Sequence, residues 1–401
     1  MPNHPRHVVV AGGGVAALEA ALALRALAQD RVAVELLAPE SEFTYRPLAV
    51  AEPFRAGEAK RFPLKNLVEA AGATLRQGTL ESVDAERREV TTGEGDALVY
   101  DALLLALGAQ ARPGLPGALT FRGPQDQALL TSLLDQAKTG QVRKVVFAVP
   151  VGLTWALPLY ELALLTAVHL ADSGVTDVQI ELVTAEQRPL LLFGSEASDA
   201  VTELLVSRGI VICADTAPMA FEAGALLLAP QGRIEADAVV TLPRLEGAPL
   251  PGVPHDANGF VPTDEHGRVN VAGDVYAAGD LTDFPIKQGG LAAQQADAAA
   301  ESIAADVGAS IEPTSFRPVL RGLLLTGLSP RYMRAEPSKH GSVIDTEPLW
   351  WPPAKIVGRY LAPFLALQLG LATAPPRIDE RTAVEVEVEL ARGHVGPWSE
   401  L

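Results

Sequence analysis

The chain has 401 residues, 48% of them hydrophobic and 20% charged, and its formal net charge is −17 at pH 7. This length and apolar content predict a globular protein of about two or three domains and exclude a disordered chain. The acidic balance argues against a nucleic acid as partner.

The first predicted unit is a strand, a glycine turn and a helix near the N-terminus. Val8–Val10 is predicted to be a buried parallel strand, and a helix is predicted to begin near Val15. Between them, Gly12-x-Gly14-x-x-Ala17 matches the dinucleotide fingerprint with alanine in the last place. The first glycine permits the turn, the second lets the backbone approach a pyrophosphate, and the third small residue lets helix and strand pack closely. The pattern therefore predicts a dinucleotide site at the helix N-terminus.

A second strand is predicted over Arg31–Ala38, shortly before Glu40. The fingerprint expects an acidic residue near this strand end to hold the adenosine ribose. Glu40 is the first candidate and Glu35 the second, and the alternative for either is a solvated carboxylate. Further on, Arg46-Pro47 places a guanidinium beside a rigid apolar corner. Arg46 either clamps a phosphate or forms a salt bridge in a packed loop, and the residues favour neither.

A second βαβ unit is predicted after a Pro/Gly linker at Pro113–Pro116. Before it come a helix and short strands over Leu64–Val90 and a buried strand, Val99–Ala109, that contains Gly108. The elements predicted from there on are the amphipathic helix Gln125–Lys138, the strand Lys144–Val149, the helix Pro158–Ala171, the strand Val178–Thr184, the helix Glu196–Ser207 and the strand Asp237–Leu242.

The phosphate loop of this second unit departs from the fingerprint. The segment Val149–Trp155 has one glycine, Gly152. Pro150 removes a backbone donor, and Trp155 is expected to fill space that a pyrophosphate needs. A nicotinamide cofactor is therefore not expected to bind here in the usual way.

The C-terminal part begins with a predicted strand over Val271–Asp280 and an Ala-rich helix over Lys287–Ala305, which is expected to pack against a flat surface or another backbone. Two further β-like runs are Leu320–Leu325 and Thr382–Leu390.

Between those runs lies the aromatic segment Leu349–Leu371, which contains Trp350-Trp351. Its apolar residues Ile356, Tyr360, Phe364, Leu367 and Leu371 are spaced to share one helical face, with Pro363 as a potential kink. Two interpretations compete: a cover over the active site, or an interfacial anchor with tryptophan at the lipid headgroups.

The single cysteine, Cys213, excludes a disulfide framework and an intramolecular redox dithiol, and it fits a reducing cytoplasm. It lies in a buried-strand pattern and is interpreted as inert core. The seven histidines lack metal-ligand spacing, so no metal site is predicted. Residues 1–6 are polar and no apolar run reaches about 20 residues, so neither a signal peptide nor a membrane span is expected.

These elements together resemble the FAD-dependent pyridine nucleotide–disulfide oxidoreductase superfamily, the flavoproteins with two dinucleotide-binding domains. The resemblance rests on the Gly12–Ala17 fingerprint, the Tyr100–Ala109 element, the second βαβ unit and Val275–Asp280. Within the superfamily, Phe43–Leu48 (FTYRPL) and Lys287–Gly290 (KQGG) look most like sulfide:quinone reductases, flavocytochrome c sulfide dehydrogenases and type II NADH dehydrogenases.

The resemblance implies an α/β fold with two Rossmann-like domains of three-layer ββα/βαβ type, one inserted in the other, and a C-terminal region. The implied FAD-binding domain is discontinuous, over residues 1–116 and 253–320. Residues 117–252 form the second domain, NAD(P)-binding-like with a degenerate phosphate loop. Residues 321–401 cover the flavin or form an interface.

The resemblance also implies roles for individual residues. Glu40 would hold the adenosine ribose, Asp280 would hydrogen-bond the ribityl chain or the pyrophosphate, and the helix from Lys287 would aim its N-terminus at the flavin pyrimidine edge. Lys287 is the predicted catalytic residue, because it would stabilise negative charge on reduced flavin; the alternative is a surface cation. The full predicted cofactor set is Gly12, Gly14, Ala17, Glu40, Arg46, Pro47, Gly108, Gly279, Asp280, Lys287 and Gln288.

One departure narrows the function. The redox cysteine pair of disulfide reductases and sulfide oxidisers is absent, so sulfide chemistry through a trisulfide is not expected. The predicted protein is an FAD-dependent oxidoreductase that passes two electrons from an unassigned small-molecule donor to an acceptor, with a quinone as the first guess. The protein is expected in the cytoplasm. It either has no membrane contact or binds peripherally to the inner face of the membrane through residues 349–372. A homodimer is a second open alternative.

Two alternatives remain at this stage. One is an enzyme like type II NADH dehydrogenase, with NAD(P)H in an unusual pose. The other is a non-catalytic flavin protein that acts as a redox sensor or assembly partner.

Overall fold

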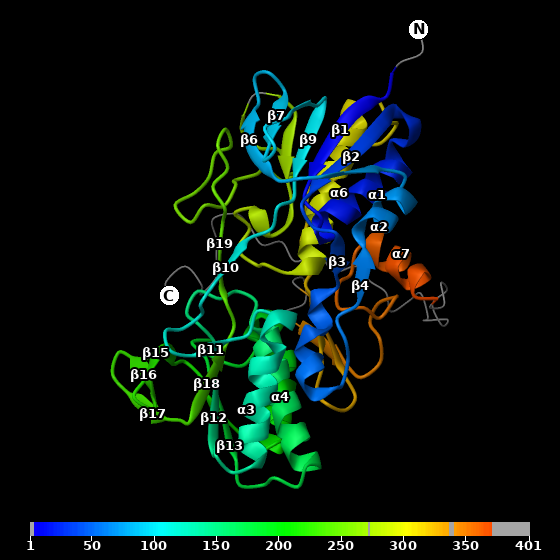
Figure 1. The fold of residues 1–401 in the computed structure, drawn as a ribbon. Coiled ribbons are helices and arrows are strands. Elements are labelled where there is room, and N and C mark those ends of the chain that lie inside the picture. Colours follow the sequence, from blue (N-terminus) through cyan, green and yellow to red (C-terminus); the bar gives the residue numbers. More distant parts are fainter. Residues whose placement is uncertain (1–3, 272, 337–340, 371–401) are drawn as a thin grey trace.

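The computed structural model describes residues 4–271, 273–336 and 341–370, and it contains two parallel sheets (Figure 1). The first sheet has the strand order β20-β9-β1-β2-β5, and every neighbouring pair is parallel. Val8, Val9 and Val10 of its central strand are fully buried, as expected of a parallel strand covered on both faces. The strands are β1 (Arg6–Ala11), β2 (Val32–Ala38), β5 (Thr74–Gln77), β9 (Ala102–Leu105) and β20 (Val275–Ala277).

Helices cover one face of this sheet and a small antiparallel sheet covers the other. Helices α1 (Val15–Leu27) and α6 (Gly289–Asp306) lie side by side and pack through fully buried alanines (Figure 1). The Ala-rich helix thus packs against another backbone, as predicted. The opposite layer is β6 (Leu80–Asp84), β7 (Glu89–Thr92) and β8 (Ala97–Val99). The shorter elements here are β3 (Glu42–Thr44), the 3-10 helix η2 (Arg46–Phe54), β4 (Arg61–Pro63) and α2 (Leu64–Ala70).

The second sheet repeats this three-layer arrangement. Its strand order is β11-β18-β12-β13-β14, again with parallel neighbours. Three helices cover one face, and the antiparallel sheet β15-β16-β17 covers the other. The strands are β11 (Leu119–Thr120), β12 (Lys144–Ala148), β13 (Gln179–Val183), β14 (Ile210–Cys213), β15 (Ala217–Glu222), β16 (Ala225–Ala229), β17 (Arg233–Glu235) and β18 (Ala238–Thr241), and the helices are α3 (Gln127–Lys138), α4 (Leu157–Asp172) and α5 (Ser195–Ser207).

The second unit lies between two strands of the first sheet, β9 and β20. The chain leaves through β10 (Gln110–Arg112) and returns through β19 (Arg244–Glu246), and these two strands pair antiparallel between the units (Figure 1). The predicted fold class, two Rossmann-like units with one inserted in the other, is confirmed. The residue limits predicted for the domains stay a prediction.

The C-terminal part contacts both units. The antiparallel sheet of β21 (Arg321–Leu324), β22 (Arg331–Glu336) and β23 (Gly341–Asp345) packs on α4 and α5 of the second unit. The chain then crosses back, and α7 (Leu361–Gln368) packs on α1 of the first unit. The predicted strand Thr382–Leu390 lies outside the described residues.

Two helix predictions were wrong at their N-terminal ends. Helix α6 begins at Gly289 rather than Lys287. Helix α7 begins only at Leu361, so Ile356 and Tyr360 precede it and the predicted single face does not form. Pro363 lies in its first turn, where proline is tolerated, and so does not interrupt it. Leu371 lies outside the described residues.

Over the part of the chain that the structure describes, no helix is both long and apolar enough to cross a membrane.

Candidate functional site

The glycine turn between β1 and α1 forms an open cradle at the helix N-terminus. Gly12 has φ +131°, and a Cβ there would overlap the carbonyl oxygen of Ala106, so only glycine fits. Gly14 is the N-cap of α1, and no heavy atom lies within 4 Å of the position that its Cβ would take. Ala17 is fully buried against the sheet, and the first turn of α1 contains no acidic residue. The open space and the free N–H groups fit a phosphate.

The two carboxylates proposed for the ribose lie in different surroundings. Glu40 is exposed, and its Oε2 lies 3.2 Å from the position of a Cβ on Gly13, beside the cradle. Glu35 accepts from Arg76 Nε at 2.7 Å and lies 2.9 Å from His7 Nε2. Glu35 is therefore engaged in ion pairing, and the geometry favours Glu40.

The turn after β20 is held by a glutamine that sequence reasoning missed. Gly279 N donates to Gln295 Oε1 at 2.7 Å, and Gln295 Nε2 donates to Thr282 Oγ1 at 3.1 Å. Gly279 itself fits closely, because a Cβ there would lie 3.1 Å from that of Ala16 on α1. The one feature of the sequence that could have indicated this role is the side-chain amide of Gln295, which lies on the buried face of an alanine-rich helix. This network fixes the position of Asp280.

Asp280 and two cations form a charged group near the cradle. Burial raises the pKa of the Asp280 carboxyl, while Lys287 and Arg46 oppose that rise. Burial also lowers the pKa of Lys287 to about 8, and Asp280 is the main charge that counters it. The Lys287 Nζ donates to the carbonyl of Thr282 at 2.5 Å and lies 3.8 Å from the ring centroid of Phe260. Lys287 is thus a half-buried cation rather than a surface one.

The N-terminus of α6 begins directly after Lys287. The N-cap is Gln288, whose side-chain oxygen accepts from Leu291 N at 2.8 Å and whose amide donates to the carbonyl of Arg321 at 3.3 Å. Gly108, at the end of β9, has φ +73° and open space around its Cβ position. Of the predicted residues, Arg46, Pro47, Lys287 and Gln288 line one cavity.

A segment from the C-terminal part is clamped onto this region, which the sequence did not reveal. Lys355 Nζ lies 2.6 Å from both carboxylate oxygens of Glu161 and donates to the carbonyl of Pro47 at 3.0 Å. The next residue, Ile356, donates its N–H to Tyr45 Oη at 2.9 Å. Burial raises the pKa of Tyr45 to about 12, so it stays a neutral acceptor.

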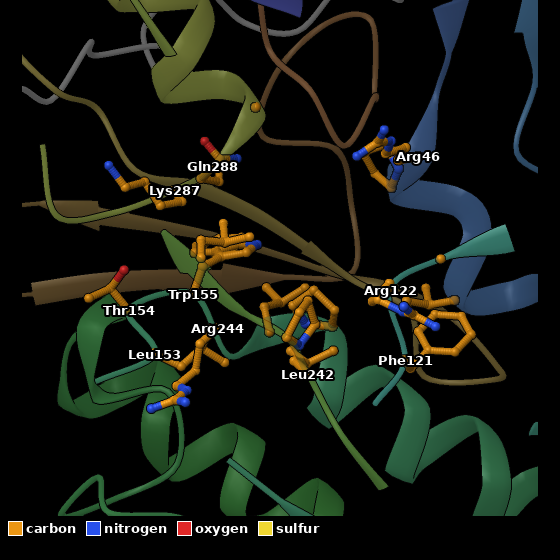
Figure 2. A pocket seen from close by; sticks show the side chains of 18 of the residues that line it. Arg46, Phe121, Arg122, Leu153, Thr154, Trp155, Leu242, Arg244, Lys287 and Gln288 are labelled. Atoms are coloured by element: carbon orange, nitrogen blue, oxygen red, sulfur yellow. The ribbon is translucent and has the colours of Figure 1, made fainter. Parts of the chain in front are cut away.

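Two cavities flank this clamp. The first has a volume of about 580 Å³ and lies between the two units; Figure 2 shows Arg46, Lys287 and Gln288 of the first unit around it with Trp155, Leu153 and Leu242 of the second. The second, of about 350 Å³, is mostly apolar and is lined by Tyr45, Leu48, Lys60, Phe62, Leu323, Leu325, Pro330, Pro352–Ile356, Leu361, Ala362, Leu365, Ala366 and Leu369. Lys355 and Ile356 line both cavities and so separate them.

The corresponding loop of the second unit lines the first cavity and has open space at Gly152, but its two neighbouring polar and aromatic side chains are engaged elsewhere. Trp155 packs on Phe193 with ring centroids 5.8 Å apart, and Thr154 Oγ1 donates to the carbonyl of Pro285 at 2.5 Å (Figure 2 labels Trp155 and Thr154). Glu186, the acidic residue after β13, is buried and accepts from Tyr160 Oη at 2.5 Å. Its carboxylate is therefore directed into the protein rather than toward a ribose.

Two of the remaining predictions concern cysteine and metal. Cys213 is half-buried on β14 and its Sγ lies 3.8 Å from Thr216 Oγ1. Among the described residues, no group of three or more His, Cys, Asp or Glu side chains could hold a metal ion.

Comparison with known proteins shows the class to which this fold and site belong. The sequence model of the pyridine nucleotide-disulphide oxidoreductase family matches residues 6–301. An NADH dehydrogenase-like protein of Mycobacterium tuberculosis is 28% identical over 293 residues, which cover 68% of this chain and 72% of that protein. The sulfide-quinone reductase of Aquifex aeolicus is 29% identical over 187 residues, 45% of this chain and 43% of the relative.

Solved structures share the fold. The sulfide:quinone oxidoreductase of Aquifex aeolicus matches with a TM-score of 0.77 at 22% identity, over 85% of this chain and 86% of that one. Putidaredoxin reductase, in its covalent complex with putidaredoxin, matches with a TM-score of 0.61 at 20% identity, over 83% and 82% of the two chains.

The fold and the cradle define a two-unit dinucleotide-binding oxidoreductase. The chain belongs to the pyridine nucleotide-disulphide oxidoreductase family. It is an FAD-dependent oxidoreductase, with FAD as its cofactor.

The open space at Gly14 leads to a first prediction. In Gly14→Val, the side chain enters the cradle without meeting protein, so the fold persists while the Kd for FAD rises at least about tenfold, or ~1.4 kcal/mol. Gly14→Ala gives a smaller rise. Flavin fluorescence titration of apoprotein measures both, with circular dichroism as the check of folding.

The control is Gly232→Ala, in the turn between β16 and β17, where a Cβ makes only ordinary contacts. If Gly14→Val binds FAD as tightly as this control, the phosphate does not lie at the cradle.

Proposed function

We propose that this enzyme passes two electrons from a small-molecule donor through FAD to a quinone-like acceptor. The observation that carries the proposal is the apolar cavity of about 350 Å³ beneath α7, which shares Leu323, Lys355 and Ile356 as lining residues with the first cavity. Two cavities beside one cofactor site would suit an enzyme in which the electron donor binds in one cavity and the electron acceptor binds in the other.

The proposed FAD site uses the predicted residues. The cradle of Gly12, Gly14 and Ala17 would receive the pyrophosphate and Glu40 the adenosine ribose. The remaining proposed contacts are Gly108, Gly279 and Asp280, together with four residues that line the first cavity: Arg46, Pro47, Lys287 and Gln288.

When bound, FAD supplies the two-electron chemistry. The N-terminus of α6 and the ammonium of Lys287 would hold positive charge beside the ring of the reduced cofactor, which is negative. Buried Asp280 keeps that ammonium charged near neutral pH, because it opposes the effect of burial on the pKa of Lys287. Lys287 thereby favours the reduced cofactor.

The first cavity is the proposed donor entrance. Pro150, Trp155 and the inward-facing Glu186 of the second unit argue against NAD(P)H in the usual pose. A small donor that reaches the cofactor without a phosphate loop fits this geometry better. NADH is the alternative donor, because one relative is named as an NADH dehydrogenase-like protein. Family membership favours an enzyme over a non-catalytic sensor.

The second cavity is the proposed acceptor site. Its wall is formed by aliphatic and proline side chains, and Ile356 at its edge packs on Gly289 at the start of α6. The Aquifex relative is named as a sulfide-quinone reductase, and a quinone is an apolar acceptor that would suit this cavity. The single cysteine of this chain argues against the sulfide half of that chemistry.

A peripheral membrane contact of α7 is a further part of the proposal. Trp350 is buried and packs edge-on against Tyr332 at 5.1 Å, so it serves as cover rather than as an anchor. Leu367 and Leu369 are 57% and 45% exposed near the acceptor cavity and are the side chains available to lipid. This contact would place the enzyme at the inner face of the membrane.

The acceptor assignment predicts a variant that blocks one half-reaction. Ala366 is buried and lines the apolar cavity, so Ala366→Phe fills it. We expect photochemically reduced enzyme to be reoxidised by ubiquinone-1 at least about ten times more slowly, a barrier of ~1.4 kcal/mol. Reoxidation by ferricyanide, which needs no apolar cavity, stays unchanged, and stopped-flow absorbance follows both.

The matched control is Leu367→Phe on the exposed side of the same helix. Equal ubiquinone rates in the two variants would remove the acceptor cavity from the proposal. The same stopped-flow instrument tests the donor. If excess NADH rapidly bleaches the absorbance of the oxidised flavin, the electron donor is NADH rather than a small molecule.

The role of Lys287 predicts a change in reduction potential. Lys287→Met removes a charge interaction of about 1.4 kcal/mol, which lowers the two-electron potential of the flavin by about 30 mV. Since burial lowers the pKa of Lys287 to about 8, the difference from wild type is full below pH 8 and vanishes above it. Dye-coupled titrations from pH 6.5 to 9.5 measure it.

The exposed Lys65→Met on α2 serves as control and leaves the potential unchanged. A pH-independent difference for Lys287→Met, or none, would contradict the assigned role.

A further inference from the structure

A pair of buried carboxyl groups lies between α1 and α6, beneath the N-terminus of α7. Glu19 of α1 is fully buried in an otherwise apolar helix face. Asp297 of α6 is half-buried and interacts with Glu19 through its carboxyl group, whose Oδ1 is buried without a hydrogen-bond partner. Neither residue belongs to the proposed FAD site or to either cavity.

Glu19 caps the C-terminal helix. Its Oε1 accepts from Tyr360 N at 2.7 Å and its Oε2 from Leu361 N at 2.8 Å, so one carboxylate receives the first N–H groups of α7. Gly358 lies directly against the same carboxylate, where a side chain would not fit. Backbone N–H groups and the helix dipole both favour the ionised form of Glu19.

Asp297 carries the proton of the pair. A hydrogen bond between two carboxyl groups requires a proton on one of them, and the backbone bonds leave it to Asp297. Burial, the charge of Glu19 and the charge of Glu301 raise the pKa of Asp297 from 3.8 to about 9, and Arg359 opposes them. At neutral pH Asp297 therefore donates to Glu19.

The remaining charged and titratable groups that face the pair come from the same three elements. Glu301 of α6 accepts from Arg359 Nη1 at 3.1 Å and from Thr314 N at 2.9 Å. Tyr360 is neutral, because burial raises the pKa of its hydroxyl. The single nearby cation, among the described residues, is thus shared with Glu301, and a second negative charge beside Glu19 would lack a partner.

We propose that one proton shared by Glu19 and Asp297 latches α7 onto the first unit, and that its loss at alkaline pH releases the segment from Tyr360 to Gln368. Helices α1 and α6 pack through fully buried alanines and hold the sheet, whereas α7 has eight residues and exposed leucines. When both carboxyl groups are ionised they must be hydrated, and α7 is therefore the element that detaches to let water reach them.

The direction with pH follows from the raised pKa of Asp297. The latch also needs Glu19 ionised, and burial raises the pKa of that carboxyl. The folded state binds the Asp297 proton more tightly than the unfolded chain, so the contribution of this proton to stability is complete below pH 3.8. It weakens as pH rises and is lost as pH passes about 9. Because Leu361, Ala362 and Leu365 of α7 line the apolar cavity, opening also exposes that cavity.

Amide hydrogen exchange on FAD-loaded full-length protein tests the latch. We expect the protection factor of the peptide containing Tyr360 and Leu361, corrected for intrinsic exchange, to fall at least about tenfold between pH 8 and pH 10. In Asp297→Asn, the amide donates to Glu19 without a charge, so protection persists to pH 10. Flavin absorbance monitors cofactor retention throughout.

Glu69→Gln, on the exposed face of α2, is the matched control and behaves as wild type. Constant wild-type protection from pH 8 to pH 10, or the same fall in Asp297→Asn, would overturn the proposal. If Asp297→Asn does not fold, the infrared C=O band of a protonated carboxyl group is followed in the wild-type protein instead. We expect this band at pH 8 and expect it to vanish at the same pH at which protection is lost. A band that is missing at pH 8, or that persists after protection is lost, would overturn the latch.

Discussion

The arrangement of this enzyme depends on one buried ion pair, Lys355–Glu161. The two side chains are 8% and 0% exposed and are separated by 194 residues in the sequence. Burial alone would neutralise both groups, since it raises the pKa of Glu161 and lowers that of Lys355. Their mutual attraction, together with bonds to Pro47 O and Leu325 N, offsets that cost. A buried charge left without its partner costs about 3–5 kcal/mol, so the three segments are held together.

This constraint explains why the site has two sides. The ammonium of Lys355 connects the second unit, through Glu161, to the η2 corner of the first unit, through Pro47. The same backbone places Ile356 over the start of α6. The clamp is thereby flanked by a cavity between the units and a more apolar cavity under α7. In the function that we propose, the electron donor and the acceptor use these two cavities separately.

Local signals in the sequence predicted most of the fold. The Val8–Val10 strand, the Gly12–Ala17 turn and the helix after it follow from residues within about 20 positions of one another, and each forms as expected. The degenerate character of the loop at Val149–Trp155 stays a prediction from Pro150 and Trp155, although the structure shows Trp155 packed on Phe193. The family resemblance then extended this reading to the cofactor.

Contacts between distant residues could not be predicted. The start of α7 is set by the carboxylate of Glu19, more than 300 residues earlier, and no spacing rule near Tyr360 encodes it. Gly358 breaks the apolar periodicity that seemed to continue from Ile356. Gln295 likewise looked like a polar interruption of an alanine helix until the Gly279 turn was placed beside it. In each case a buried polar group acts through tertiary structure.

The central claim is that this chain has one working dinucleotide site, in the first unit. Equilibrium dialysis of the apoprotein with FAD, and then of the FAD-loaded protein with NADH, counts the nucleotides bound per chain. The account predicts one FAD per chain and no further NADH at concentrations that saturate FAD. Failure to take up FAD, or a second dinucleotide bound per chain, would contradict it.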